Sequence, residues 1–324
     1  MKGAERMERE ERLEQEERLK QEEQSPREGP LSMPFTGRGV DEKADRRVER
    51  VMALRVTGSD WTGPILAGAT KGEGRAEQEE LLVREWPLTL YLNGEELVTL
   101  LASPEHMEDL AIGFLAAEGF LQRAEQMKGL RGDYENGQVF VEAESALTAG
   151  KTFMKRYITT GCGKGMTFYD VTDARHARSL EAAGTAVTAD QILARMAEMQ
   201  ALSGLYRETG GVHSAALCDG DRILLYREDI GRHNAADKIA GACFREKIAT
   251  ADKLFLTSGR ISSEILLKVA KMGIPLIASR SAPTDLAVRL GEQLGMTVVG
   301  FVRGKRMNVY SHPWRITGGE EGEP

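Results

Sequence analysis

The sequence predicts a mixed α/β protein whose C-terminal part is built around a parallel β-sheet. Three short apolar segments, residues 253–258, 274–279 and 297–302, have the length and composition of buried strands. Helical patterns begin near Ser262 and Pro283, between these segments. Because strands that alternate with helices are typical of βαβ units, we expect the three strands to lie parallel in a domain over residues 167–324.

A smaller α+β subdomain is expected over residues 49–166. Apolar runs lie on both sides of Asn93-Gly94, a pair typical of a type I′ hairpin turn. Ser103-Pro104 then fits a helix N-cap followed by proline in the first turn, and apolar residues repeat at helical spacing up to Gly119. We expect this subdomain to end in the loop that contains Cys162.

Residues 1–48 form a charged N-terminal extension with few apolar anchors. Glu alternates with Arg or Lys at helical i,i+4 spacing, until Ser25-Pro26 and Gly29-Pro30 interrupt the pattern. A coiled coil would need sustained apolar heptads, which this segment lacks. We therefore expect a solvated tail, disordered or partly helical, without chemistry of its own.

Composition narrows the class of protein. The chain has 324 residues, of which 41% are hydrophobic, as in an ordinary soluble protein. Three cysteines are too few for a disulfide framework, which favours a reducing, cytoplasmic compartment. No apolar run approaches the ~20 residues that a membrane helix needs, so we expect no membrane partner. A net charge of −7 argues against nucleic acid as a partner.

Cys162 is the most informative single residue. It lies in the run Thr-Thr-Gly-Cys-Gly-Lys at residues 159–164, with Arg156 close by in the sequence. Cationic side chains and free backbone N–H groups lower the pKa of a thiol and stabilise the nucleophilic thiolate. Cys218 and Cys243 stand in apolar contexts and are expected to be small buried hydrophobic residues. Cys162 is therefore either a reactive thiol or a loop cysteine without a role.

Arginine follows each of the three predicted parallel strands. Arg260 ends the run Ser-Gly-Arg, Arg280 is the centre of Ser-Arg-Ser, and residues 303–306 read Arg-Gly-Lys-Arg. In open α/β sheets, ligands bind beyond the carboxyl ends of the strands. We expect these arginines to lie in strand-to-helix turns, where backbone N–H groups and guanidinium groups suit phosphate. We expect a local anion site there, for a nucleotide or a phosphorylated cofactor rather than a polymer.

Two polar clusters add further candidates. His213 follows a Gly-Gly turn, and residues 228–238 concentrate complementary charges that include Arg232 and His233. His233 could simply begin a helix and bond to its neighbours. The density of charge could equally indicate a functional or supporting role. The sequence leaves both interpretations open.

A catalytic zinc site is not expected. A zinc deaminase needs His-x-Glu together with Pro-Cys-x-x-Cys. Ala215 stands where that glutamate should follow His213, and no Cys-x-x-Cys occurs anywhere in the chain. A His-Glu-x-x-His motif and a P-loop are also missing. A hydrolase on a deaminase-like scaffold is therefore the weakest of the alternatives.

Taken together, these segments resemble the FdhD family, the formate dehydrogenase accessory sulfurtransferases. The likeness spans residues 85–316, and its most specific motifs are Glu-Asp-Ile-Gly-Arg-His-Asn from Glu228 and Ser-Arg-Ser-Ala-Pro-Thr from Ser279. The other matching segments are residues 85–88, 93–94, 103–119, 159–164, 209–215, 258–264, 300–306 and 308–310.

The resemblance implies a C-terminal three-layer α/β domain related to cytidine deaminases, without their zinc site or any permanently bound metal. It also implies a sulfur carrier and sulfurtransferase, in which a cysteine desulfurase loads sulfur onto Cys162 as a persulfide. That sulfur passes to Mo-bis(molybdopterin guanine dinucleotide) before the cofactor enters formate dehydrogenase. A homodimer is implied as well. The matching cofactor-binding stretch is Phe301, Val302, Arg303, Gly304, Lys305 and Arg306, and we add Arg260 and Arg280 to it.

The chain departs from the family pattern in one respect. Many members carry Cys-x-x-Cys in the reactive loop, whereas here only Cys162 is present. A second cysteine could assist sulfur release by forming a disulfide, and that route is absent. The alternative function is a non-catalytic chaperone that binds the molybdenum cofactor for formate dehydrogenase maturation.

Overall fold

The computed structural model describes residues 46–56, 75–144, 157–158, 180–181 and 184–318, which all belong to one compact unit, Arg46–Pro324. Residues 1–45 of the predicted extension and the loop around Cys162 lie outside the described residues. No helix in the described ranges is both long and apolar enough to cross a membrane.

A six-stranded mixed sheet forms the centre of the C-terminal domain, in the order β10-β9-β11-β12-β13-β14. Strands β11, β12 and β13 are parallel, which confirms the prediction, whereas β9, β10 and β14 pair antiparallel with their neighbours. The strands are β9 (His213–Cys218), β10 (Ile223–Asp229), β11 (Leu254–Thr257), β12 (Leu276–Ser279), β13 (Thr297–Arg303) and β14 (Arg306–Ser311).

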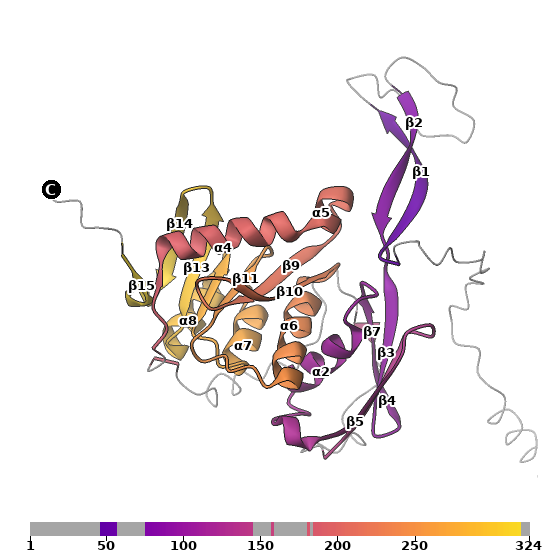
Figure 1. Cartoon of the computed structure of the whole chain (residues 1–324), viewed down its shortest axis with the longest axis horizontal. Coiled ribbons are helices and arrows are strands. Elements are labelled where there is room, and N and C mark those ends of the chain that lie inside the picture. The colour runs from indigo at the N-terminus through magenta and orange to yellow at the C-terminus, as the bar shows by residue number, and fades with distance from the viewer. Residues whose placement is uncertain (1–45, 57–74, 145–156, 159–179, 182–183, 319–324) are drawn as a thin grey trace, which may run out of the picture. The chain divides into compact units, whose positions relative to one another are not determined.

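Helices cover both faces of this sheet, so the predicted three-layer arrangement is confirmed (Figure 1). Ala215 and Leu217 of β9 pack in the core beneath α6, α7 and α8, while Ala216 and Cys218 face α4. This alternation follows from the two-residue period of a strand. The helices are α4 (Ala189–Leu202), α5 (Gly204–Thr209), α6 (Arg232–Glu246), α7 (Ser263–Lys271) and α8 (Asp285–Leu294).

Hydroxyl caps fix the starts of two of these helices close to the predicted positions. The side chain of Ser262 accepts a hydrogen bond from the N–H of Ile265, and that of Thr284 accepts one from Ala287. Both caps satisfy N–H groups that lack partners inside the helix. Short segments complete the domain: β8 (Val187–Thr188), the 3₁₀ turn Pro313–Arg315 and β15 (Ile316–Thr317).

The N-terminal subdomain is a five-stranded sheet in the order β5-β6-β3-β4-β7, with helix α2 packed on it. Asn93 and Gly94 have φ values of 51° and 85°, which confirms the predicted hairpin turn between β3 and β4. Its elements are β3 (Trp86–Leu92), β4 (Glu95–Ala102), α2 (Met107–Ala117), the 3₁₀ turn Ala124–Gln126, β5 (Met127–Asp133), β6 (Gln138–Ala143) and β7 (Tyr157–Ile158).

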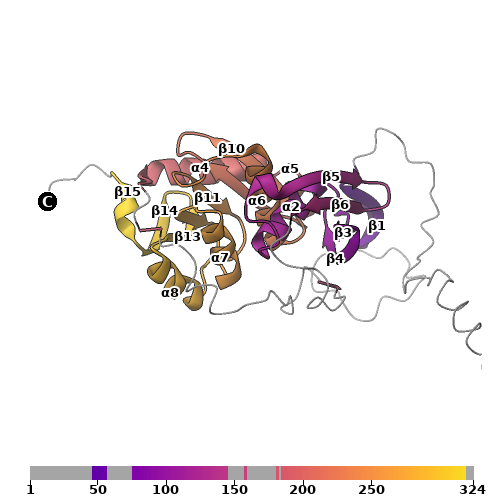
Figure 2. The same ribbon diagram turned by 90° about the horizontal axis from the view of Figure 1, so that it is seen from below.

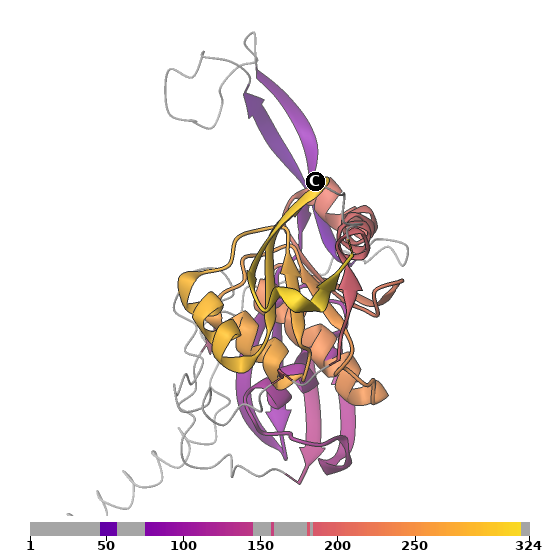
Figure 3. The ribbon, with the colours of Figure 1, turned by 90° about the vertical axis from the view of Figure 1, so that its left-hand side faces the viewer.

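Strands β1 (Val48–Val56) and β2 (Arg75–Val83) form a separate antiparallel ladder. Figures 1 and 3 show this ladder standing apart from the two larger sheets. Its base reaches the C-terminal domain, where a Cβ added at Gly211 would lie 2.5 Å from a methyl carbon of Val83.

The predicted N-cap at Ser103 is wrong. Helix α2 begins at Met107, and its N-cap residue is His106, whose backbone is left-handed with φ 52°. The Ser103 hydroxyl instead donates to the buried carboxylate of Asp229 at 3.1 Å and accepts from Lys238 at 2.9 Å. These charged groups, distant in the sequence, use the hydroxyl that local capping would need.

Helices α2 and α6 cross at two glycines. A Cβ added at Gly113 would come 1.8 Å from the carbonyl oxygen of Asp237, and one added at Gly241 would come 1.8 Å from that of Asp109. Each glycine admits the backbone of the other helix, so no larger residue fits. Helix α2 consequently lies between α6 and the five-stranded sheet, as Figure 2 shows.

We expect Gly113→Ala to lower the free energy of unfolding by about 3 kcal/mol or more, because the methyl group would force the two helices apart. The helical preference of Ala over Gly, ~1 kcal/mol, does not offset this. Gly204→Ala is the control, since the nearest atom to an added Cβ there is 3.8 Å away on Arg207. Urea denaturation measures both, and an unchanged midpoint for Gly113→Ala would contradict the packing described.

Candidate functional site

Four strand ends meet at one edge of the six-stranded sheet. Strands β11, β12 and β13 are parallel, so their carboxyl ends point the same way. Strand β9 runs antiparallel to β11, with Ala215 opposite Thr257, so its first residue, His213, lies at the same edge. This is the edge at which open α/β sheets bind ligands.

Hydrogen bonds to backbone carbonyl groups tie the loops at this edge together. The Ser279 hydroxyl donates to the carbonyl of Gly259 at 2.6 Å, and the N–H of Arg280 donates to the carbonyl of Thr257 at 3.2 Å. The N–H of Phe301 reaches the carbonyl of Ser281 at 3.0 Å. The predicted site residues Arg260, Arg280 and Arg303 therefore extend from loops that are fixed relative to one another, and all three side chains are exposed.

The stretch from Phe301 to Arg306 is a hairpin between β13 and β14, and not the strand-to-helix turn that the sequence predicted. Phe301 is half-buried with φ 53°, and the Arg303 guanidinium carbon lies 5.6 Å from its ring centre. The Val302 side chain is 1% exposed and packs in the core, so only its backbone is available to a ligand. Gly304, Lys305 and Arg306 are exposed at the turn.

Most of the charge in residues 228–238 is structural. Lys238 and Asp229 are both 0% exposed and form an ion pair at 2.7 Å. The same carboxylate accepts from the N–H groups of Ser103 and Gly231, at 3.0 and 2.9 Å, and from the Asn234 amide at 2.9 Å. Buried polar groups are normally hydrogen-bonded in this way. The cluster joins the two subdomains and fixes the first turn of α6.

A second ion-pair network across this junction was missed from the sequence. Asp109 of α2 is 4% exposed, and it accepts from Arg227 at 2.9 and 3.2 Å and from Arg245 at 2.6 Å. The sequence held one signal for this network: Asp109 lies four residues before Gly113, and therefore on the same helix face, the one that packs against α6.

Cys218 and Cys243 were predicted to be buried, and the structure confirms this. Cys218 is 0% exposed and Cys243 is 6% exposed, and burial raises the pKa of each thiol to about 12. Neither thiol is ionised near neutral pH, so both are poor nucleophiles. The site placed on Cys162, with Arg156 and Lys164, lies outside the described residues and stays a prediction.

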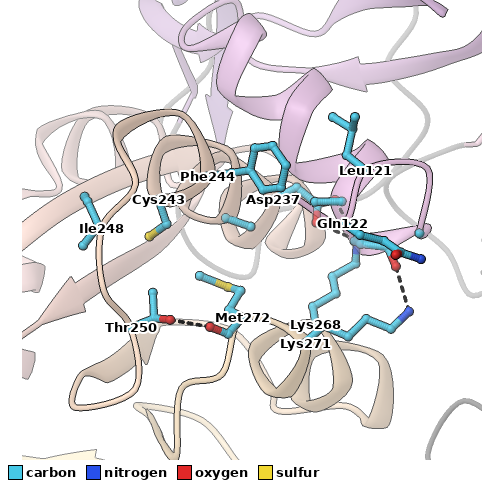
Figure 4. Close-up of a pocket in the computed structure, with 14 residues that line it drawn as sticks. Leu121, Gln122, Asp237, Cys243, Phe244, Ile248, Thr250, Lys268, Lys271 and Met272 are labelled. Carbon is cyan, nitrogen blue, oxygen red and sulfur yellow. Dashed lines mark hydrogen bonds and ion pairs between the residues drawn. The ribbon is translucent and has the colours of Figure 1, made fainter. Parts of the chain in front are cut away.

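A cavity of about 450 Å³ lies between α2, α6 and α7. Figure 4 shows Phe244, Ile248 and Met272 around it. The lysines on its border are already bonded: Lys268 binds both carboxylate oxygens of Asp237 at 2.6 and 2.7 Å, and Lys271 donates to a carbonyl of α2 at 2.8 Å. None of the predicted cofactor-binding residues lines this cavity.

Histidines at the sheet edge are kept neutral. Burial and the nearby Arg232 lower the pKa of His213. Burial, Lys268 and Arg232 lower the pKa of His233 to about 3, and its Nε2 lies 3.2 Å from the Glu264 carboxylate. Among the described residues, no three His, Cys, Asp or Glu side chains gather in a way that could hold a metal ion.

The fold is therefore a three-layer α/β domain that presents arginines on loops fixed at one sheet edge. The chain belongs to the FdhD/NarQ family, whose model matches residues 83–317.

Relatives support this assignment. The sulfur carrier protein FdhD of Bacillus subtilis is 46% identical over 239 residues, which cover 74% of this chain and 91% of the relative. That of Staphylococcus aureus strain MRSA252 is 46% identical over 242 residues, covering 74% and 90%. A crystal structure from Desulfotalea psychrophila, provisionally described as a formate dehydrogenase accessory protein, aligns with a TM-score of 0.67 at 25% identity. It covers 83% of this chain and 99% of that one.

We expect Lys238→Met to destabilise the fold by about 3–5 kcal/mol, because the Asp229 carboxylate would stay buried without its counter-ion. Lys128→Met is the control, since Lys128 is half exposed and its partner Glu144 is 74% exposed. Such surface pairs contribute about 0–1 kcal/mol. Thermal unfolding of both variants compares them, and equal losses would show that the buried pair has no special role.

Proposed function

We propose that this chain is a sulfur carrier and sulfurtransferase of formate dehydrogenase maturation, with Cys162 as the persulfide site. It takes sulfur from a cysteine desulfurase in the cytoplasm and passes it to Mo-bis(molybdopterin guanine dinucleotide). Family membership and the relatives' name support the carrier role. The observation that carries the assignment to Cys162 is that the other two cysteines are buried, neutral thiols.

Loading is a thiol exchange that needs no oxidant. The Cys162 thiolate attacks the terminal sulfur of a persulfide on the desulfurase, the S–S bond of the donor breaks, and the donor cysteine leaves as a thiolate. Arg156 and Lys164 are near in sequence and would favour the thiolate form.

Release as sulfide requires two electrons, because the carried sulfur is formally zero-valent. An external thiol attacks the Cys162 sulfur, forms a mixed disulfide with it and expels hydrogen sulfide or its anion. A second thiol then reduces that disulfide and regenerates Cys162. Since the loop has no second cysteine, the reducing thiols come from outside the chain.

The exposed cations at the sheet edge are the proposed contacts to the client cofactor. Arg260, Arg280 and Arg303 project from loops whose backbones are bonded to each other. Guanidinium groups suit the phosphates of a guanine dinucleotide. The half-buried ring of Phe301 provides an apolar surface beside them.

We expect Cys162→Ala to abolish the sulfur adduct that mass spectrometry detects after incubation with a desulfurase and cysteine. Formate dehydrogenase activity in cells that carry only this variant should fall to background. Cys243→Ala is the matched control, because its thiol is buried and neutral; it should keep the adduct on Cys162.

A non-catalytic chaperone predicts different maturation results for the same kinds of variant. Full maturation by Cys162→Ala, together with lost maturation by Arg303→Ala or Arg306→Ala, would exclude the carrier role and favour a non-catalytic cofactor-binding protein. An unmodified Cys162 in the wild-type protein would also exclude it.

We expect Arg303→Gln and Arg306→Gln each to weaken the binding of guanosine diphosphate about tenfold, because each loses a charge-assisted hydrogen bond. Arg289→Gln is the control: its side chain is exposed on α8 and pairs with Asp285 at 3.2 Å. Isothermal titration calorimetry measures all three, and equal affinity in every variant would exclude the hairpin as a nucleotide contact.

A further inference from the structure

The first turn of helix α6 contains no acidic side chain, and the carboxylate bonded just before it, that of Asp229, is already paired with Lys238. The N-cap residue of the helix is Gly231, and no side chain caps its first turn. Arg232 and His233 occupy the first two helical positions instead. A helix N-terminus carries about half a positive charge and is stabilised by anions, so an arginine at this position adds positive charge to positive charge.

The guanidinium of Arg232 lacks a partner among the described residues. Its Nε is buried without a hydrogen bond, and no carboxylate described here lies within ion-pair distance of it. Glu264 is near enough to act on it electrostatically, yet that carboxylate lies at 3.2 Å from His233. Burial and the nearby charge of Arg260 lower the pKa of Arg232. Arg232 is partly buried and Arg260 is exposed, and an anion between these two neighbouring guanidinium groups would supply the charge partner that Arg232 lacks among the described residues.

The Arg232 side chain packs against Gly259, where there is little room for a larger residue. A Cβ added at Gly259 would lie 3.1 Å from the Cβ and 3.3 Å from the Cδ of Arg232, and 3.4 Å from Nδ1 of His213. The aliphatic part of Arg232 therefore lies across the end of β11, beside Arg260. Because His213 is neutral, it contributes a hydrogen-bonding ring nitrogen here and no further charge.

We propose that Arg232 and Arg260, with the first N–H groups of α6 and the imidazole of His213, form a phosphate subsite. A tetrahedral phosphate can accept hydrogen bonds from two guanidinium groups and from the free N–H groups of a helix start. The subsite is separate from the Phe301–Arg306 hairpin, which lies two strands away along the sheet.

The phosphate subsite and the Phe301–Arg306 hairpin are close enough for one ligand to contact both. Neighbouring strands lie about 4.8 Å apart, so the ends of β11 and β13 are separated by about 10 Å. A nucleotide that carries a diphosphate can span this distance. The assignment of the phosphate to the guanine dinucleotide of the client cofactor rests on the proposed function, whereas the subsite itself does not.

Titration with inorganic pyrophosphate tests the subsite directly in the full-length chain. We expect Arg232→Gln to weaken pyrophosphate binding about tenfold or more, through the loss of charge-assisted hydrogen bonds. Gly259→Ala keeps every charge but displaces Arg232, and it should weaken binding as well. Arg289→Gln should bind as the wild type does. Thermal unfolding tests whether each variant is folded. If one of them is not, Arg260→Gln takes its place.

Equal pyrophosphate affinity in the wild type and in folded Arg232→Gln would overturn the subsite, and so would the absence of binding to the wild type. Guanosine diphosphate then identifies the source of the phosphate. Loss of affinity for it in both Arg232→Gln and Arg303→Gln supports one nucleotide across both places. If Arg232→Gln loses affinity for pyrophosphate but keeps its affinity for guanosine diphosphate, the subsite takes free phosphate. That result overturns the assignment to the client cofactor. The sulfur adduct on Cys162 reports on the carrier role independently.

Discussion

Lys238 and Asp229 are both completely buried and form an ion pair at 2.7 Å on which the arrangement of the two subdomains depends. Removing two charges from water costs more than their attraction returns unless further hydrogen bonds satisfy them. Here those bonds come from Ser103 of the N-terminal subdomain and from Gly231 and Asn234 at the start of α6. The pair therefore satisfies its own polar groups only when both subdomains are in place.

The same carboxylate links this junction to the candidate ligand site. By accepting from the N–H of Gly231, Asp229 holds the first turn of α6, and Arg232 follows at once. Close packing of α2 on α6 at Gly113 and Gly241 fixes the rest of the helix. The position of Arg232 thus depends on the contacts that α6 makes with Asp229 and with α2.

The elements that sequence predicted well are those set by neighbours in the chain. The parallel strands follow from apolar runs, and the starts of α7 and α8 follow from Ser262 and Thr284, which cap within their own first turns. Ser103 could not be predicted, because its partners Asp229 and Lys238 are more than a hundred residues away and nothing local distinguishes it from a capping serine. The arginines of the proposed site were predicted as a set because each lies at or just after the end of a strand. Arg232 was not singled out, since its isolation depends on tertiary burial.

The hydrogen bonds among the strand-end loops have a kinetic and an entropic consequence. The Ser279 hydroxyl and the N–H groups of Arg280 and Phe301 bond these loops to one another, so the proposed binding surface is organised before a ligand arrives. Mainly the exposed arginine side chains would lose freedom on association. Binding to such a preorganised surface carries a small ordering cost. At the proposed anion site, discrimination among ligands would then reside in dissociation rates, since the long-range field of the clustered cations would govern association.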